Sequence, residues 1–166
     1  MTPKKEWKDA GYVTEPVDKN LNLKEEIRRL CKEKDAIILA HYYTVGDIQD
    51  IADFVGDSLA LARKASDTDA KVMVMCGVHF MAETCKLLSP DKTVLCPDLT
   101  AGCSLADSCD AADLRKYKAE HPGYQVASYV NTTAAVQALT DVVEPPGNGV
   151  KVMESSPQDA KTIFGH

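Results

Sequence analysis

The sequence predicts an α/β fold made of parallel sheets with helices on both faces, repeated in more than one domain. Two observations support this prediction: short, wholly apolar runs alternate with longer amphipathic stretches, and Gly, Pro and Asp cluster between them. The runs predicted to be strands are 36–40, 71–76, 93–96 and 125–130. The stretches predicted to be helices, from the spacing of their apolar residues, are 21–35, 46–66, 80–90 and 111–121.

Length and charge limit the function classes. The chain of 166 residues suffices for one ordinary domain or two small ones. Its net charge of -6 and pI of about 5.2 argue against nucleic acid or an anionic membrane as the main partner. The sequence contains no long apolar run, and its first residues are polar, so neither a spanning helix nor a signal peptide is expected. A cytoplasmic location is the resulting expectation.

The domain organisation follows from the same pattern. Residues 1–20 have no clear period and are expected to form an N-terminal arm. Pro, Asp and Gly cluster near 97–102, where a new alternation of helix and strand begins. We therefore expect a first α/β domain over 21–100 and a partial second α/β domain over 101–166.

Polar aromatic residues follow the first predicted strand. In parallel sheets ligands bind beyond the carboxyl ends of the strands, so His41 and Tyr43 are candidates for a crevice there. Strand alternation would send Tyr42 to the opposite side, where it would pack. The alternative is that the imidazole and the hydroxyls only cap the strand end.

Other polar residues favour structural roles. Ser58, in Gly56-Asp57-Ser58, can cap the following helix or, with the free N–H groups there, hold an anion. Asp47, Asp50 and Asp53 lie at helical spacing and favour a solvated or structural face over a metal site. His79 starts a predicted helix, where packing is favoured over chemistry.

The six cysteines fall into two groups. Cys31, Cys76 and Cys85 lie in apolar patterns and are expected to behave as small hydrophobic residues. The other three lie in or beside a Gly- and Asp-bearing loop, at spacings that match no close metal-binding pair. They are Cys96, Cys103 and Cys109.

Three long strings resemble one family, quinolinate synthase, or NadA. They are AHYYTVGDIQDIADFVGDSLALA, GVHFMAETCKLLSPDKTVLCPDLTAGCSLADSC and SYVNTTAAVQALTD. The resemblance implies three similar α/β domains around a central site, of which this sequence holds the first and part of the second. It also implies condensation of iminoaspartate with dihydroxyacetone phosphate to quinolinate, in NAD biosynthesis, by a monomer or homodimer.

The resemblance also implies a cofactor and site residues. The family holds a [4Fe-4S] cluster through three cysteines, of which Cys103 matches one. His41 and Ser58 match contacts to the substrate carboxylates, and Tyr43 matches a tyrosine that assists proton transfer. Two residues of the second domain match donors to the other side of the substrate, namely Tyr129 and Asn131.

The sequence departs from the family at one position and in extent. Pro146 stands where the family has a serine that contacts substrate, and proline offers neither hydroxyl nor N–H. The other two cluster cysteines and the third domain have no counterpart here. The leading hypothesis is therefore an inactive piece of a quinolinate synthase. The alternatives are a non-catalytic remnant that binds a small dicarboxylate or phosphate, and a half-protein that folds poorly alone.

Overall fold

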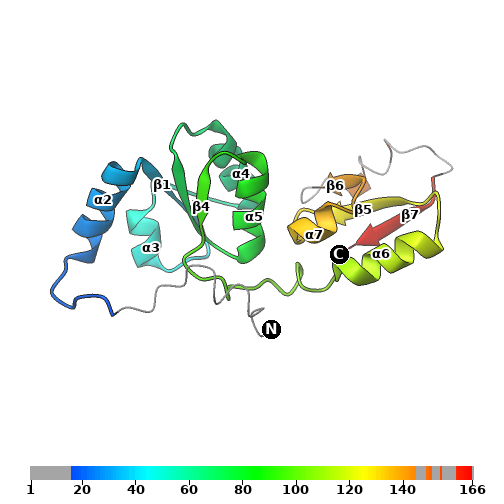
Figure 1. Ribbon diagram of the computed structural model, residues 1–166, viewed down its shortest axis with the longest axis horizontal. Coiled ribbons are helices and arrows are strands. Elements are labelled where there is room, and N and C mark those ends of the chain that lie inside the picture. The colour runs from blue at the N-terminus through cyan, green and yellow to red at the C-terminus, as the bar shows by residue number, and fades with distance from the viewer. Residues whose placement is uncertain (1–15, 145–148, 151–153, 155–159, 166) are drawn as a thin grey trace. The chain divides into compact units, whose positions relative to one another are not determined.

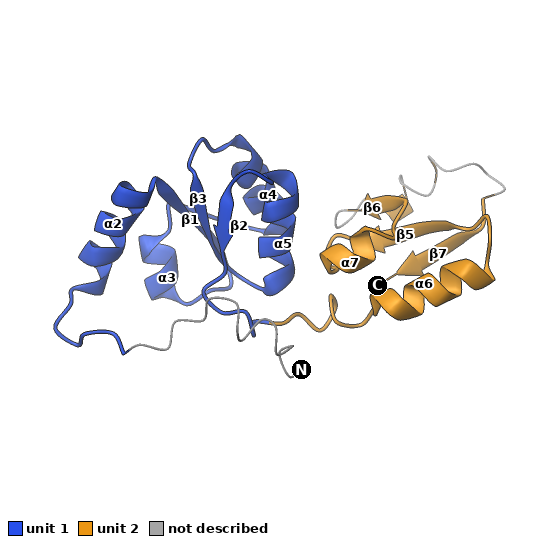
Figure 2. Cartoon of the chain, viewed as in Figure 1, with its two compact units in different colours: residues 1–101 blue, residues 102–166 orange. Residues whose placement is uncertain are grey.

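The computed structural model describes residues 16–144, 149–150, 154 and 160–165. The chain forms two compact units, residues 1–101 and 102–166, which are described separately below (Figure 2). The two α/β domains expected from the sequence, over 21–100 and 101–166, remain predictions. Most of the expected N-terminal arm and the position of Pro146 lie outside the described residues.

The first unit is a four-stranded sheet in the order β2-β1-β3-β4, with every strand pair parallel. Helices connect the strands, as parallel connections require. The elements are α2 (Leu23–Lys34), β1 (Ala36–His41), α3 (Gly46–Ile51), β2 (Phe54–Gly56), α4 (Ser58–Asp67), β3 (Val72–Cys76), α5 (His79–Leu88) and β4 (Thr93–Leu95).

Helices cover both faces of this sheet (Figure 1). Ile38, Ala40 and Cys76 form a buried cluster on one face, against apolar residues of α2 and α3. Because side chains alternate along a strand, Leu39 and Met75 point to the opposite face, where α4 and α5 lie. Both side chains are fully buried. This three-layer arrangement confirms the predicted fold class.

The predicted continuous helix over 46–66 is wrong. Ala52 has an extended backbone with ψ 145°, which ends α3, and the strand β2 follows before α4 begins. Asp53 lies at this break: its N–H donates to the Ile38 carbonyl over 2.9 Å, and its carboxylate accepts from the Ile38 N–H over 2.8 Å. These contacts with a neighbouring strand override a local apolar spacing that suits a helix.

The second unit is a three-stranded parallel sheet in the order β6-β5-β7. Its core contains Leu114, Val126 and Val136, contributed by a helix, the central strand and a second helix. Its elements are α6 (Ala111–Glu120), β5 (Gln125–Tyr129), α7 (Ala134–Gln137), β6 (Val142–Glu144) and β7 (Thr162–Gly165). The predicted α/β class with parallel strands is confirmed here as well.

The two units repeat one strand pair at a separation of 88 positions. Leu39 pairs with Phe54 in the first unit, and Ala127 pairs with Val142 in the second. The register is therefore identical in the two units. A connection that contains one helix joins the paired strands in each unit, α3 in the first and α7 in the second.

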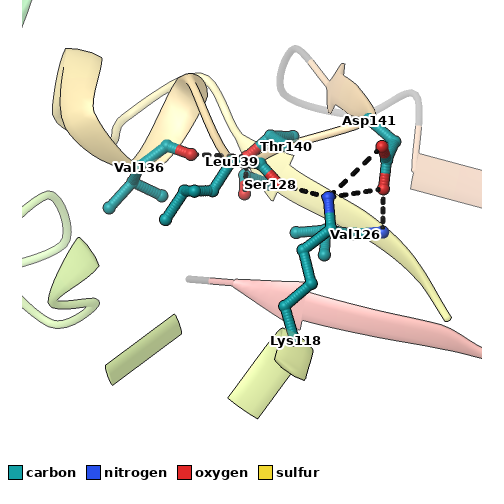
Figure 3. A network of polar contacts seen from close by, with 7 residues as sticks. All are labelled: Lys118, Val126, Ser128, Val136, Leu139, Thr140 and Asp141. Carbon is teal, nitrogen blue, oxygen red and sulfur yellow. Dashed lines mark hydrogen bonds and ion pairs between the residues drawn. The ribbon is translucent and has the colours of Figure 1, made fainter. Parts of the chain in front are cut away.

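In each unit, an aspartate just before the second strand of the pair makes the same two hydrogen bonds to the first strand. In the second unit, Asp141 accepts from the Val126 N–H over 2.8 Å and donates its own N–H to the Val126 carbonyl over 2.8 Å (Figure 3). Lys118 adds an ion pair at 3.4 Å, and the Ser128 and Thr140 hydroxyls bond each other over 2.7 Å. Asp141 thus occupies the position that Asp53 has in the first unit.

We expect Asp141→Asn to destabilise the protein by about 1 kcal/mol at pH 7. The pKa of Asp141 lies below its ordinary value, chiefly because the Val126 N–H bonds the carboxylate and further because of Lys118. The Asp141 carboxylate therefore contributes to the free energy of unfolding above the unfolded pKa of about 4, and this contribution is lost as the pH falls through the folded pKa. The expected loss of stability is small because the Asp141 side chain is 46% exposed. Urea unfolding at pH 7 and pH 3 measures it.

The matched control is Asp107→Asn, because the Asp107 side chain is exposed and no ion pair of it is found in the described part of the chain. The control is expected to leave the free energy of unfolding within about 0.5 kcal/mol at both values of pH. Equal losses in the two variants would contradict the role assigned to Asp141.

Candidate functional site

The carboxyl edge of the first sheet brings together three strand ends. β1 ends at His41, which pairs with Gly56 at the end of β2, and Cys76 ends β3 beside Ala40. Parallel strands place these ends at one edge of the sheet, and Ser58 lies two residues beyond Gly56. His41, Tyr43 and Ser58 therefore belong to one edge of one unit.

His41 is a buried imidazole with a defined proton position. Its residue exposure is 5%, and its Nδ1 accepts a hydrogen bond from the Tyr43 N–H over 3.4 Å. An accepting Nδ1 carries no proton, so Nε2 carries it. Burial lowers the pKa of His41, and the nearby Asp57 carboxylate offsets this only in part. His41 is thus a neutral donor at pH 7.

An NMR titration of the His41 C2–H signal is expected to give a pKa below 6.5, the ordinary value. Since the folded pKa lies below the unfolded one, His41 contributes stability above the unfolded pKa of about 6.5, and this contribution is lost as the pH falls through the folded value. The same signal in the urea-unfolded chain provides the reference. A folded-state pKa at or above the reference would contradict the buried, neutral imidazole.

Both tyrosines contact the imidazole ring. The centroid of the Tyr43 ring lies 3.8 Å from that of His41, and the Tyr42 centroid lies at 4.4 Å. The Tyr43 hydroxyl oxygen accepts from the Val78 N–H over 3.1 Å, which ties the loop after β1 to the loop after β3. The expectation that Tyr42 packs on the side opposite His41 is wrong, because its ring contacts the imidazole and the residue is 62% exposed. The chain turns after His41, as the bond from Thr44 N to the His41 carbonyl shows, so strand alternation no longer applies.

The cap of α4 is Asp57 rather than Ser58. The Asp57 carboxylate accepts from the Ala60 N–H over 2.8 Å, and Ser58 is the first residue of the helix. Among the described residues no hydrogen bond of the Ser58 hydroxyl is found. The capping function predicted for Ser58 is therefore wrong, and its hydroxyl is available to a ligand at the edge where His41 lies.

The corresponding edge of the second unit carries Tyr129 and Asn131. Tyr129 ends β5, and its carbonyl accepts from the Thr132 hydroxyl over 3.0 Å. Asn131 lies within the turn that this bond closes, and it is partly exposed. The constant separation of 88 places Tyr129 at the position of His41 and Asn131 at that of Tyr43. The two predicted residues thus share one loop of the second unit.

The buried cysteines behave as predicted. Burial raises the pKa of both Cys76 and Cys85 to about 11, so both stay protonated and inert at neutral pH. Cys31 packs against the buried cluster beneath α2, and burial raises its pKa as well.

Cys103 lies in the loop before α6, where its carbonyl accepts from the Asp107 N–H over 2.9 Å. All six cysteines of the sequence lie in the described part of the chain, where no group of three or more metal-binding side chains is found. The residues present therefore do not complete a site for a cluster held by three thiolates.

His79 begins α5 and lines a surface hollow of about 380 Å³ beside β4, together with Glu83 and Lys86. Its Nδ1 lies 3.8 Å from a Glu83 carboxylate oxygen, and its side chain is 18% exposed. The predicted preference for packing over chemistry at His79 stays a prediction.

Sequence reasoning missed the residues that hold the two strand-end loops. Gln49 in α3 and Gln137 at the end of α7 each donate two hydrogen bonds to loop carbonyls. Thr44 and Thr132 close the turns. The signal that reveals them is the pattern Thr-x4-Gln-x3-Asp, which occurs at 44–53 and again at 132–141.

Comparisons with known proteins cover most of the chain. The family described as NadA, Quinolinate synthetase A protein, matches residues 25–165. A quinolinate synthase of Trichodesmium erythraeum is 55% identical over 86% of this chain and 44% of its own length. Those of Chloroherpeton thalassium and Mycolicibacterium paratuberculosis are 53% and 56% identical over 93% of this chain, and over 48% and 44% of their own lengths.

The chain spans slightly less than half the length of these relatives. In the described residues, no helix is long and apolar enough to cross a membrane. The family match extends over both compact units, including the two strand-end loops and the loop of Cys103. The chain belongs to the quinolinate synthetase A family.

Proposed function

We propose that the complete protein makes quinolinate by condensing iminoaspartate with dihydroxyacetone phosphate, a step in NAD biosynthesis in the cytoplasm. The observation that carries this proposal is the buried, neutral His41 imidazole beside Tyr43 and Ser58 at one sheet edge. A charge-neutral N–H donor and a hydroxyl suit carboxylate oxygens of a small dicarboxylate. The family membership of the chain supports the same reaction.

His41 and Ser58 have the roles of substrate donors in this proposal. The Nε2–H of His41 donates to a carboxylate oxygen, and the Ser58 hydroxyl donates to the same group. Ser58 also begins α4, whose free N–H groups and dipole favour negative charge. Buried donors hold an anion more strongly than exposed ones because water screens them less.

Tyr43 has the role of proton transfer. Its hydroxyl oxygen accepts from the Val78 N–H over 3.1 Å, a contact that holds the hydroxyl in place at the sheet edge where His41 lies. Such a hydroxyl can pass a proton to or from a substrate carbon or nitrogen during condensation. Tyr129 and Asn131 supply a hydroxyl and an amide from the second unit as further substrate donors.

The [4Fe-4S] cluster of the proposed enzyme would take Cys103 as one of its three cysteine ligands. When bound, such a cluster supplies a Lewis acid. Because Cys103 is the single cysteine assigned to it here, anaerobic reconstitution of the 166-residue chain is expected to give less than one four-iron cluster per chain. Iron and sulfide analysis measures this, and a stoichiometric cluster on the isolated chain would show that the assignment of ligands is wrong.

The proposed activity is tested with the complete protein under anaerobic conditions. Iminoaspartate and dihydroxyacetone phosphate are supplied, and quinolinate is quantified by chromatography. The expected result is quinolinate formation that needs both substrates, by a monomer or homodimer. Absence of quinolinate from a protein with its full iron content would overturn the proposal.

A second function is a non-catalytic protein that binds a small dicarboxylate or phosphate at the same residues. The His41 imidazole and the Ser58 hydroxyl, which has no hydrogen bond found among the described residues, lie at one sheet edge and support it, because these two groups suit an anion by themselves. Calorimetric titration with malate and with inorganic phosphate would then give saturable heat that His41→Ala abolishes, without turnover. A silent titration would remove this function.

A further inference from the structure

The loop that carries His41, Tyr42 and Tyr43 is restrained by hydrogen bonds from the side chains of Gln49 and Thr44. The Gln49 amide, from α3, donates to the Tyr42 carbonyl over 2.8 Å and to the Thr44 carbonyl over 2.7 Å. The Thr44 N–H and hydroxyl both donate to the His41 carbonyl over 2.9 Å. Bonds to the carbonyls of residues 41, 42 and 44 thus restrain the backbone that carries the imidazole and the tyrosine ring.

The second unit repeats this arrangement at the same separation of 88 positions. The Gln137 amide donates to the Val130 carbonyl over 3.4 Å and to the Thr132 carbonyl over 3.3 Å. The Thr132 hydroxyl donates to the Tyr129 carbonyl over 3.0 Å. The side-chain contacts of the glutamine and the threonine are therefore the same in both units, with longer distances to the glutamine in the second.

What changes between the units is the set of side chains that the loop presents. His41 is replaced by Tyr129 and Tyr43 by Asn131, whereas the threonine and the glutamine are the same residue types. Both amide bonds of each glutamine go to main-chain carbonyls, so they serve any side chain that the loop carries. These bonds therefore restrain the backbone of the loop and do not involve the side chains that the loop carries.

We propose that Gln49 is a positioning residue, which fixes the loop after β1 so that His41 and Tyr43 meet the substrate in one defined arrangement. This inference rests on the proposed function. Without Gln49, the Tyr42 and Thr44 carbonyls lose their shared donor, and the peptide of Tyr43 between them is less restrained, while the Thr44 bonds to the His41 carbonyl and the Tyr42 N–H bond to the Gly56 carbonyl remain. The Tyr43 N–H would then leave His41 Nδ1, and the imidazole would lose its fixed proton position.

The test uses Gln49→Met in the complete protein, because methionine is close to glutamine in length and lacks the amide donor. We expect kcat/KM for quinolinate formation to fall about 10- to 100-fold, mainly through kcat, since misplaced catalytic groups affect the reacting geometry. We also expect the pKa of His41, measured by NMR titration, to rise toward its ordinary value, because a looser loop admits water to the ring. Asp57 stays in place in this variant, so its charge does not account for the change.

Two variants serve as controls. Asp50→Asn alters an exposed residue of the same helix, whose ion pair with Lys24 is open to solvent, and it should change neither readout. Gln137→Met should lower turnover through Tyr129 and Asn131 while leaving the His41 titration unchanged. The side chain in Gln49→Asn is one methylene shorter and reaches at most one carbonyl, so we expect smaller changes in the same direction. This variant replaces Gln49→Met if Gln49→Met does not fold.

The outcomes separate this inference from the proposed function. A lower free energy of unfolding with both kcat/KM and the His41 titration unchanged would overturn the positioning role and leave Gln49 a structural residue. A shifted His41 titration in a protein that makes no quinolinate would uphold the positioning of His41 and overturn the proposed reaction. Loss of turnover with an unshifted His41 would also overturn the inference.

Discussion

Replacing His41 with alanine is expected to lower kcat/KM for quinolinate formation by the complete protein about 100-fold or more. The variant removes a buried neutral N–H donor and leaves a substrate carboxylate without its partner in a site where water screens little. His41→Phe keeps most of the ring volume, so it separates loss of the donor from loss of packing. Steady-state kinetics of the two variants measures the effect.

The matched control for His41 is His121→Ala. His121 follows α6, and its ring stacks on Tyr117 with a centroid distance of 4.1 Å. We expect this control to retain kcat/KM within about a factor of two. An active His41→Phe, or a control that loses as much activity as His41→Ala, would remove His41 from the site.

Leu39→Ala is expected to destabilise the protein by about 3 kcal/mol. Leu39 is fully buried at the centre of β1, on the sheet face that α4 and α5 cover, and truncation leaves a cavity among well-packed neighbours. Leu87→Ala is the control, because Leu87 is 55% exposed on α5, and it should cost less than about 0.5 kcal/mol. Urea unfolding compares them; similar losses would place the core of the first unit elsewhere.

β1, β3, β4 and β5 were predictable because each is a short apolar run with a sharp end, whereas β6 and β7 were not predicted. The runs at 71–76, 93–96 and 125–130 match β3, β4 and β5 to within one residue at either end. β2 was not predictable in this way. It has three residues, too few to show a two-residue period, and Ile48, Ile51 and Val55 around it keep a helical spacing.

Part of the candidate site was also predictable. The end of a parallel strand is a known place for chemistry, and this rule places His41 and Tyr43 at one edge. The exposed position of Tyr42 was not predictable, because the chain turns at His41 and side chains no longer alternate between the two faces of the sheet after that residue. The cap at Asp57 instead of Ser58 depends on where the backbone enters α4, which differs by one residue from the sequence estimate.

Long-range polar contacts account for most of what local sequence reasoning missed. Asp53 reads as one of three carboxylates on a helix, yet it bonds Ile38 in a neighbouring strand and pairs with Arg28 at 2.8 Å. Gln49 reads as a surface residue of an amphipathic helix, yet its amide holds a loop. In both cases the partner is a main-chain group whose position exists only after the sheet has formed.

The most direct measurement of the central claim is a crystal structure of the complete protein with bound phthalate, an aromatic dicarboxylate of the shape of quinolinate. The account predicts a carboxylate oxygen within about 3 Å of both His41 Nε2 and the Ser58 hydroxyl. It also predicts that Tyr43 faces the ring of the ligand and that Gln49 keeps its two carbonyl contacts. Phthalate bound away from the carboxyl edge of β1, with His41 Nε2 donating to a main-chain carbonyl instead, would contradict it.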